Sequence, residues 1–97
     1  MTVFTQQAMP VLWAQTMYNL ADAYTNRILG NRAENLELAI NCYQQILTVF
    51  TQQAMPVERV KTIVNLANTY TDRIQGNRAE NLELAINCYQ QALTVLT

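Results

Sequence analysis

Histidine is absent from this chain of 97 residues, and glycine, proline and cysteine occur only twice each. Without histidine, nucleophilic catalysis by a cysteine–histidine pair is excluded. Two separated thiols with no histidine are also a poor zinc site, which usually needs four ligands. We therefore expect no enzymatic activity, no metal and no cofactor.

Charge is scarce as well, because Asp, Glu, Lys and Arg make up 13% of the residues and the net charge is -1. Such a surface lacks the basic field that nucleic acids require. No basic segment followed by a long apolar run is present, so neither a signal peptide nor a membrane span is predicted. We expect a cytoplasmic protein that binds protein or peptide partners, but no nucleic acid and no membrane.

The chain contains a long internal repeat. The stretch GNRAENLELAINCYQQ occurs at 30–45 and again at 76–91, and residues 2–51 match residues 48–97 at 38 of 50 positions. A constant offset of 46 residues is typical of a solenoid, whose units bury their apolar faces against one another.

The first half of each unit predicts one helix. It should begin at Pro10 or Pro56, because proline at the first helical position needs no partner for its missing N–H. It should stop at Gly30 or Gly76, because glycine favours the left-handed conformation that ends helices. Apolar residues at helical spacing form its buried face: Trp13, Met17, Leu20, Ala21, Tyr24 and Ile28, then Val60, Ile63, Leu66, Ala67, Tyr70 and Ile74.

The second half predicts another helix, capped by Asn31 with Glu34 placed to complete a capping box. It should end before Pro56. Apolar residues on two sides indicate that it packs both on its partner and on the next unit. One stripe contains Leu36, Ala39, Ile40, Tyr43, Ile46, Leu47 and Phe50, and the other contains Leu38, Cys42 and Val49.

These elements predict an all-α fold: an α-solenoid of antiparallel helix pairs, with about two repeats and a partial N-terminal helix. Residues 1–9 would be the tail of a preceding second helix, and residues 10–55 and 56–97 the two repeats of a single domain. Cys42 and Cys88 occupy equivalent positions of stacked units, about 10 Å apart. Because a disulfide needs Cα atoms within about 7 Å, we expect two free thiols.

The pattern Met17, Leu20, Ala21, Tyr24, followed by Ala39 and Tyr43, resembles the tetratricopeptide repeat (TPR). The unit is longer than the usual one and is similar to those of kinesin light chains and of cyanobacterial TPR arrays. The resemblance implies a TPR-like superhelix that serves as a scaffold for protein or peptide binding.

In TPR proteins the first helices line a concave groove. Carried over by motif position, the groove would hold Gln15, Tyr18, Asn19, Asp22, Thr25 and Asn26, and Lys61, Val64, Asn65, Asn68, Thr71 and Asp72. Asn19 and Asn65 are the main candidates, because an amide can both donate to and accept from a peptide backbone. The alternative is that these asparagines bridge helices within the array.

The ends of the repeat array suggest a second function, self-association into homo-oligomers. An uncapped solenoid end exposes apolar surface that favours a partner. The candidates for this contact are Val3, Phe4, Trp13, Leu84, Cys88 and Val95. For Trp13, packing against residues 1–8 is the alternative to a role as a partner anchor.

Overall fold

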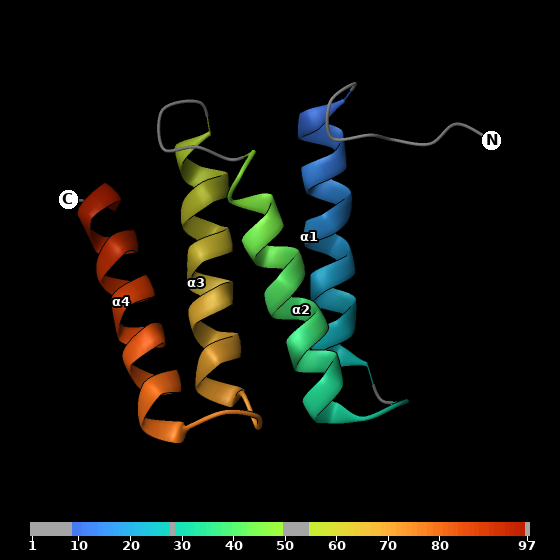
Figure 1. Cartoon of the computed structure of the whole chain (residues 1–97). Coiled ribbons are helices and arrows are strands. Elements are labelled where there is room, and N and C mark those ends of the chain that lie inside the picture. The colour runs from blue at the N-terminus through green and yellow to red at the C-terminus, as the bar shows by residue number, and fades with distance from the viewer. Residues whose placement is uncertain (1–8, 28, 50–54, 97) are drawn as a thin grey trace.

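A computed structural model describes residues 9–27, 29–49 and 55–96, with the α4 side chains described as far as Thr94. Within these residues the chain forms four helices: α1 (Pro10–Asn26), α2 (Arg32–Ile46), α3 (Pro56–Asp72) and α4 (Arg78–Leu96). Each helix packs antiparallel against the next, and α1 and α4 lie at opposite ends of the row (Figure 1). The all-α class and the antiparallel helix pairs are therefore confirmed.

The predicted helix starts are also confirmed. Pro10 and Pro56 begin α1 and α3. Asn31 caps α2: its side-chain oxygen accepts the backbone N–H groups of Ala33 at 2.9 Å and Glu34 at 3.3 Å. Asn77 caps α4 in the same way. These bonds satisfy backbone donors that have no partner inside the first turn of a helix.

The predicted helix ends are wrong by several residues. Helices α1 and α3 stop at Asn26 and Asp72, and Arg27 and Arg73 follow them in extended conformation. Gly30 and Gly76 lie further on, with φ of 89° and 84°. The glycines therefore do not cap the helices. They turn the chain toward the next helix through a conformation that strains other residues.

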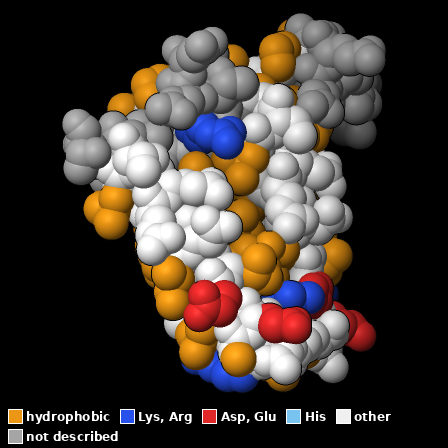
Figure 2. Space-filling model, turned by 60° about the vertical axis from the view of Figure 1, so that its left-hand side comes forward, with side chains coloured by type: hydrophobic (Ala, Val, Ile, Leu, Met, Phe, Trp, Pro, Cys, Tyr) orange, Lys and Arg blue, Asp and Glu red, His pale blue; other side chains and the backbone are white. Residues whose placement is uncertain are grey.

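The hydrophobic core lies between the helices and takes residues from all four. Leu20 and Ile74, predicted to belong to it, are exposed, at 41% and 60%, while the predicted Ile28 and Phe50 lie outside the described residues. The space-filling view shows that hydrophobic side chains also form a band on the surface (Figure 2). The core cluster contains Ala14, Ala21, Ala39, Ile40, Cys42, Tyr43, Ile46, Leu66, Ala67, Tyr70 and Ala85.

Helix α2 is covered on two sides, as its apolar pattern predicts. Leu36 and Ile40 are buried, with 0% and 5% exposure. Leu38, from the second predicted stripe, is 41% exposed, whereas Cys42 from that stripe is buried. Because α1 and α3 both pack on α2, this helix joins the two pairs.

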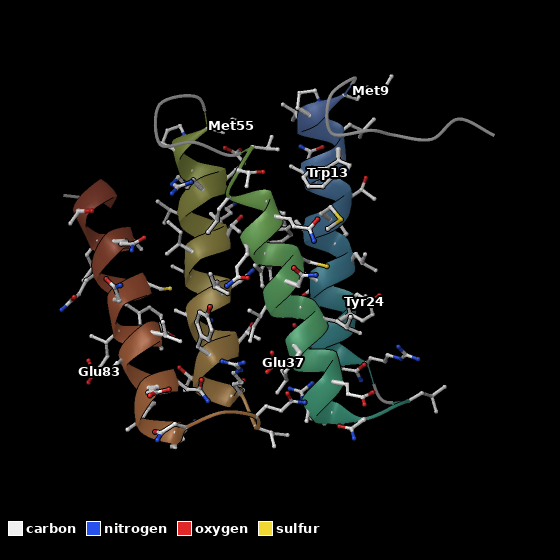
Figure 3. All side chains as sticks on the ribbon, viewed as in Figure 1. Met9, Trp13, Tyr24, Glu37, Met55 and Glu83 are labelled. Carbon is white, nitrogen blue, oxygen red and sulfur yellow. The ribbon has the colours of Figure 1, made fainter. Side chains whose placement is uncertain are left out.

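Polar groups bridge α2 to α3 and to the residue that follows it. The Gln44 amide donates to the Tyr70 hydroxyl at 2.9 Å. At one end, the Arg73 guanidinium binds both carboxylate oxygens of Glu37, at 2.5 and 3.0 Å. Arg73 also donates to Asn81 of α4 at 3.1 Å. The hydrogen bond with Glu37 raises the pKa of Arg73. Glu37 lies between α2 and α3, while its repeat counterpart Glu83 points away from the other helices (Figure 3).

The bidentate pair predicts a measurable difference between these two glutamates. Glu37→Gln should lower the free energy of unfolding by about 0.5–1 kcal/mol, because the two hydrogen bonds between the guanidinium and the carboxylate are replaced by weaker bonding to a neutral amide. Glu83→Gln should change it little, since among residues 9–27, 29–49 and 55–96 Glu83 forms no ion pair. Urea unfolding followed by circular dichroism in dilute solution measures both. Equal losses in the two variants would contradict the assignment.

Candidate functional site

A hollow of about 340 Å³ lies between the two first helices of the helix pairs. Gln15, Tyr18 and Asn19 line it from α1, and Glu58 and Lys61 line it from α3. We call these five residues the α1–α3 hollow. Helices α1 and α3 are each antiparallel to α2 and therefore run parallel to each other. Equivalent residues of the two repeats thus follow the same order along the two sides of the hollow.

Helical spacing places these side chains together. Gln15, Tyr18 and Asn19 are separated by three and four residues and therefore share one face of α1. Glu58 and Lys61 are three residues apart on α3 in the same way. Glu58 was not among the predicted groove residues. Its position one turn before Lys61 is the feature of the sequence that could have identified it.

Tyr18 is held in place by contacts with two other helices. The Asn65 side-chain amide donates a hydrogen bond to its hydroxyl, which links α3 to α1. Its ring meets that of Tyr43 from α2 edge to face, with centroids 6.0 Å apart. Tyr18 is thus a fixed wall of the hollow, and Asn65 is engaged in a bridge between helices.

The other predicted groove residues do not line this hollow. Asn26 donates to the backbone carbonyl of Asp22 at 3.0 Å, within α1. Asn68 accepts a hydrogen bond from the hydroxyl of Tyr89 on α4. Asp72 is exposed at the end of α3. The hollow therefore covers only the first half of the predicted groove.

The electrostatics of the hollow combine two neutral amides with one charge of each sign. Gln15 and Asn19 supply hydrogen-bond donors and acceptors on the α1 side. Glu58 and Lys61 supply a carboxylate and an ammonium group on the α3 side. Such a set can bind polar groups but has no strong net field to attract a phosphate or another highly charged ligand.

The predicted self-association residues fall into different environments. Trp13 and Cys88 are partly buried and pack against the core cluster. Leu84 is 41% exposed on α4, as exposed as its repeat counterpart Leu38. Val3, Phe4 and the side chain of Val95 lie outside the described part of the chain.

Cys42 and Cys88 are both free thiols, as predicted from their spacing. Burial raises the pKa of each thiol, so each holds less of the reactive thiolate at neutral pH. Among the described residues no group of three or more His, Cys, Asp or Glu side chains is placed to hold a metal ion. In the same residues, no helix has the length and apolar character needed to cross a membrane.

Comparison with known proteins identifies the repeat. Residues 60–94, which run from α3 into α4, match the tetratricopeptide repeat family. This part of the second helix pair is thus similar to a tetratricopeptide repeat, a protein-interaction module that is typically a non-catalytic scaffold. Neither the curated proteins nor the solved structures gave a match. The finer resemblance to kinesin light chains and cyanobacterial arrays stays a prediction.

The two thiols should differ in reactivity although their local sequences are identical. Cys88 is half-buried, whereas Cys42 is 6% exposed, so Cys88 should react faster with a disulfide reagent. Both should react more slowly at pH 8 than a free thiol, because raised pKa values reduce the thiolate fraction. The variants Cys42→Ala and Cys88→Ala isolate each thiol for absorbance measurements. A faster reaction at Cys42 would contradict the structure.

Proposed function

We propose that this chain is a scaffold module that binds an extended peptide in the α1–α3 hollow. The observation that carries the proposal is that polar side chains from both first helices line one concave site. The tetratricopeptide repeat at residues 60–94 supports a protein partner. No catalytic role is assigned to any of the five lining residues.

The chemistry of the hollow favours recognition of the peptide backbone. The Asn19 amide, exposed on the wall, can donate to a peptide carbonyl and accept from a peptide N–H at the same time. Gln15 offers the same groups one turn earlier. Lys61 and Glu58 would then select polar side chains of the ligand by charge.

Asn65 has a different role in this proposal from that of Asn19. Its amide donates to the Tyr18 hydroxyl, so it holds the wall of the hollow rather than contacting the ligand. The alternative considered from the sequence, an asparagine that bridges helices, therefore applies to Asn65. Asn19 becomes the principal ligand contact.

Self-association is a second candidate function, compatible with the first. It is favoured by the exposed apolar side chains of α4, the last helix of the row, among them Ile86 and Leu93. Exposed apolar surface of this kind commonly marks a contact with another protein. Peptide binding and self-association would use different surfaces, since none of the residues lining the hollow belongs to α4.

Peptides selected from a phage-displayed random library on the immobilised chain test the proposed groove. Asn19→Ala should weaken their binding about tenfold, because up to two hydrogen bonds to the backbone are lost. Isothermal titration calorimetry measures the change. Asn41→Ala is the matched control, because Asn41 is also exposed but lies on α2, outside the hollow.

Two results would refute peptide binding in the hollow. One is selected peptides whose affinity is the same for wild type, Asn19→Ala and Asn41→Ala. The other is a complete failure of selection. Chemical shift changes confined to Gln15, Tyr18, Asn19, Glu58 and Lys61 on adding a selected peptide would support it directly.

A further inference from the structure

The repeat makes it possible to compare each side chain with a counterpart 46 residues away. Leu82, Ile86 and Leu93 lie on one face of α4 and are 37%, 47% and 58% exposed. Their counterparts are Leu36 and Ile40 on α2, which are buried, and Leu47 just after α2, which is half-buried. We call Leu82, Ile86 and Leu93 the α4 outer stripe.

The difference arises from the neighbouring helix. The sequences of α2 and α4 are identical from Arg32 to Gln45 and from Arg78 to Gln91. Helix α3 covers the outer face of α2, and among the described residues no helix covers the outer face of α4. The α4 outer stripe therefore corresponds to the face of α2 that packs on the next repeat. Among the described residues, no helix packs on this stripe.

Helix α1 shows the complementary surface at the other end of the row. Thr16, Leu20 and Ala23 are exposed and lie on one face of α1, and the exposed Arg27 follows the end of this helix. We call these four residues the α1 outer stripe. Their counterparts are Thr62, Leu66 and Thr69 on α3, which are buried, and Arg73 just after α3, which is half-buried and binds Glu37 of α2.

The polar groups of the two stripes complement each other as well. Glu83 on α4 is the counterpart of Glu37, and Arg27 after α1 is the counterpart of Arg73. Arg27 has nearly the backbone conformation of Arg73, with φ and ψ of -64° and 126° against -60° and 131°. Both guanidinium groups also lie against the glycine of their loop, about 3.7 Å from where its Cβ would be.

We infer that the α4 outer stripe of one chain docks on the α1 outer stripe of a second copy, in the register of the internal α2–α3 contact. In this register Leu82 and Ile86 cover Leu20, and Glu83 pairs with Arg27 of the second copy. Gln90 donates to the second copy's Tyr24, as Gln44 does to Tyr70. Each chain then joins two others, head to tail. The inference rests on the self-association proposed above and specifies its surfaces.

The proposed register predicts different burial for Leu82 and Leu84, although both are exposed leucines of α4. Leu38, the counterpart of Leu84, stays 41% exposed even though α3 packs on its helix. Leu36, the counterpart of Leu82, is fully buried by contrast. Docking in the internal register thus buries Leu82 and leaves Leu84 in solvent, which replaces the sequence-based choice of Leu84.

Sedimentation velocity from micromolar to millimolar concentration tests the inference on the full chain. The wild type should rise above the single-chain mass of 11.1 kDa as concentration increases. Leu82→Asp should raise the dissociation constant about 10- to 100-fold, because a buried leucine is replaced by a charge. Leu84→Asp is the matched control and should associate like the wild type. Circular dichroism checks that both variants fold.

Charge reversal tests the pairing of Glu83 with Arg27. Glu83→Arg and Arg27→Glu should each weaken association about tenfold, because like charges then meet across the contact. Mixing the two variants should restore it, since the arginine introduced in one chain then faces the glutamate introduced in the other. Glu80→Arg, on the same helix, should have no comparable effect.

The outcomes distinguish the register from self-association itself. A single-chain mass at every concentration would overturn both the register and self-association. Association that Leu84→Asp abolishes and Leu82→Asp leaves intact would overturn the register alone. Failure of the mixed charge variants to associate would also overturn the register.

Discussion

The packing of α2 between α1 and α3 is the contact on which the rest of the structure depends. A single helix pair buries only one side of each helix, so its apolar second helix would remain half exposed. Helix α2 removes this exposure by covering two faces at once, with Leu36 and Ile40 buried. The Glu37–Arg73 pair and the Gln44–Tyr70 bond then set the register of one pair on the next.

The same contact creates the candidate site. Because α1 and α3 both pack on α2, they lie side by side and parallel, and their polar faces meet at the α1–α3 hollow. The Tyr18 ring against Tyr43 and the Asn65–Tyr18 bond tie this surface to the core. A binding face built on rigid helices retains its geometry without a ligand, which lowers the entropic cost of binding.

Much of the fold could be predicted from residues with strong local preferences. Pro10 and Asn31 mark helix starts because their effects involve only neighbouring backbone groups. The ends were missed, because the arginines leave the helical conformation well before Gly30 and Gly76. Of the twelve groove residues predicted by motif position, Gln15, Tyr18, Asn19 and Lys61 line the hollow. Glu58 was missed, because the motif carries no information on where the hollow ends.

The sequence alone determined the repeat, the helix starts and the two-sided character of the second helix, because these follow from local chemistry and periodicity. Only the tertiary structure decided which copy of the second helix has its outer apolar face buried. Leu36 and Leu82 occupy the same place in an identical stretch of sixteen residues, yet one is 0% and the other 37% exposed. Burial depends on the neighbour that covers a face, and α3 covers α2 while no described helix covers α4 in this way.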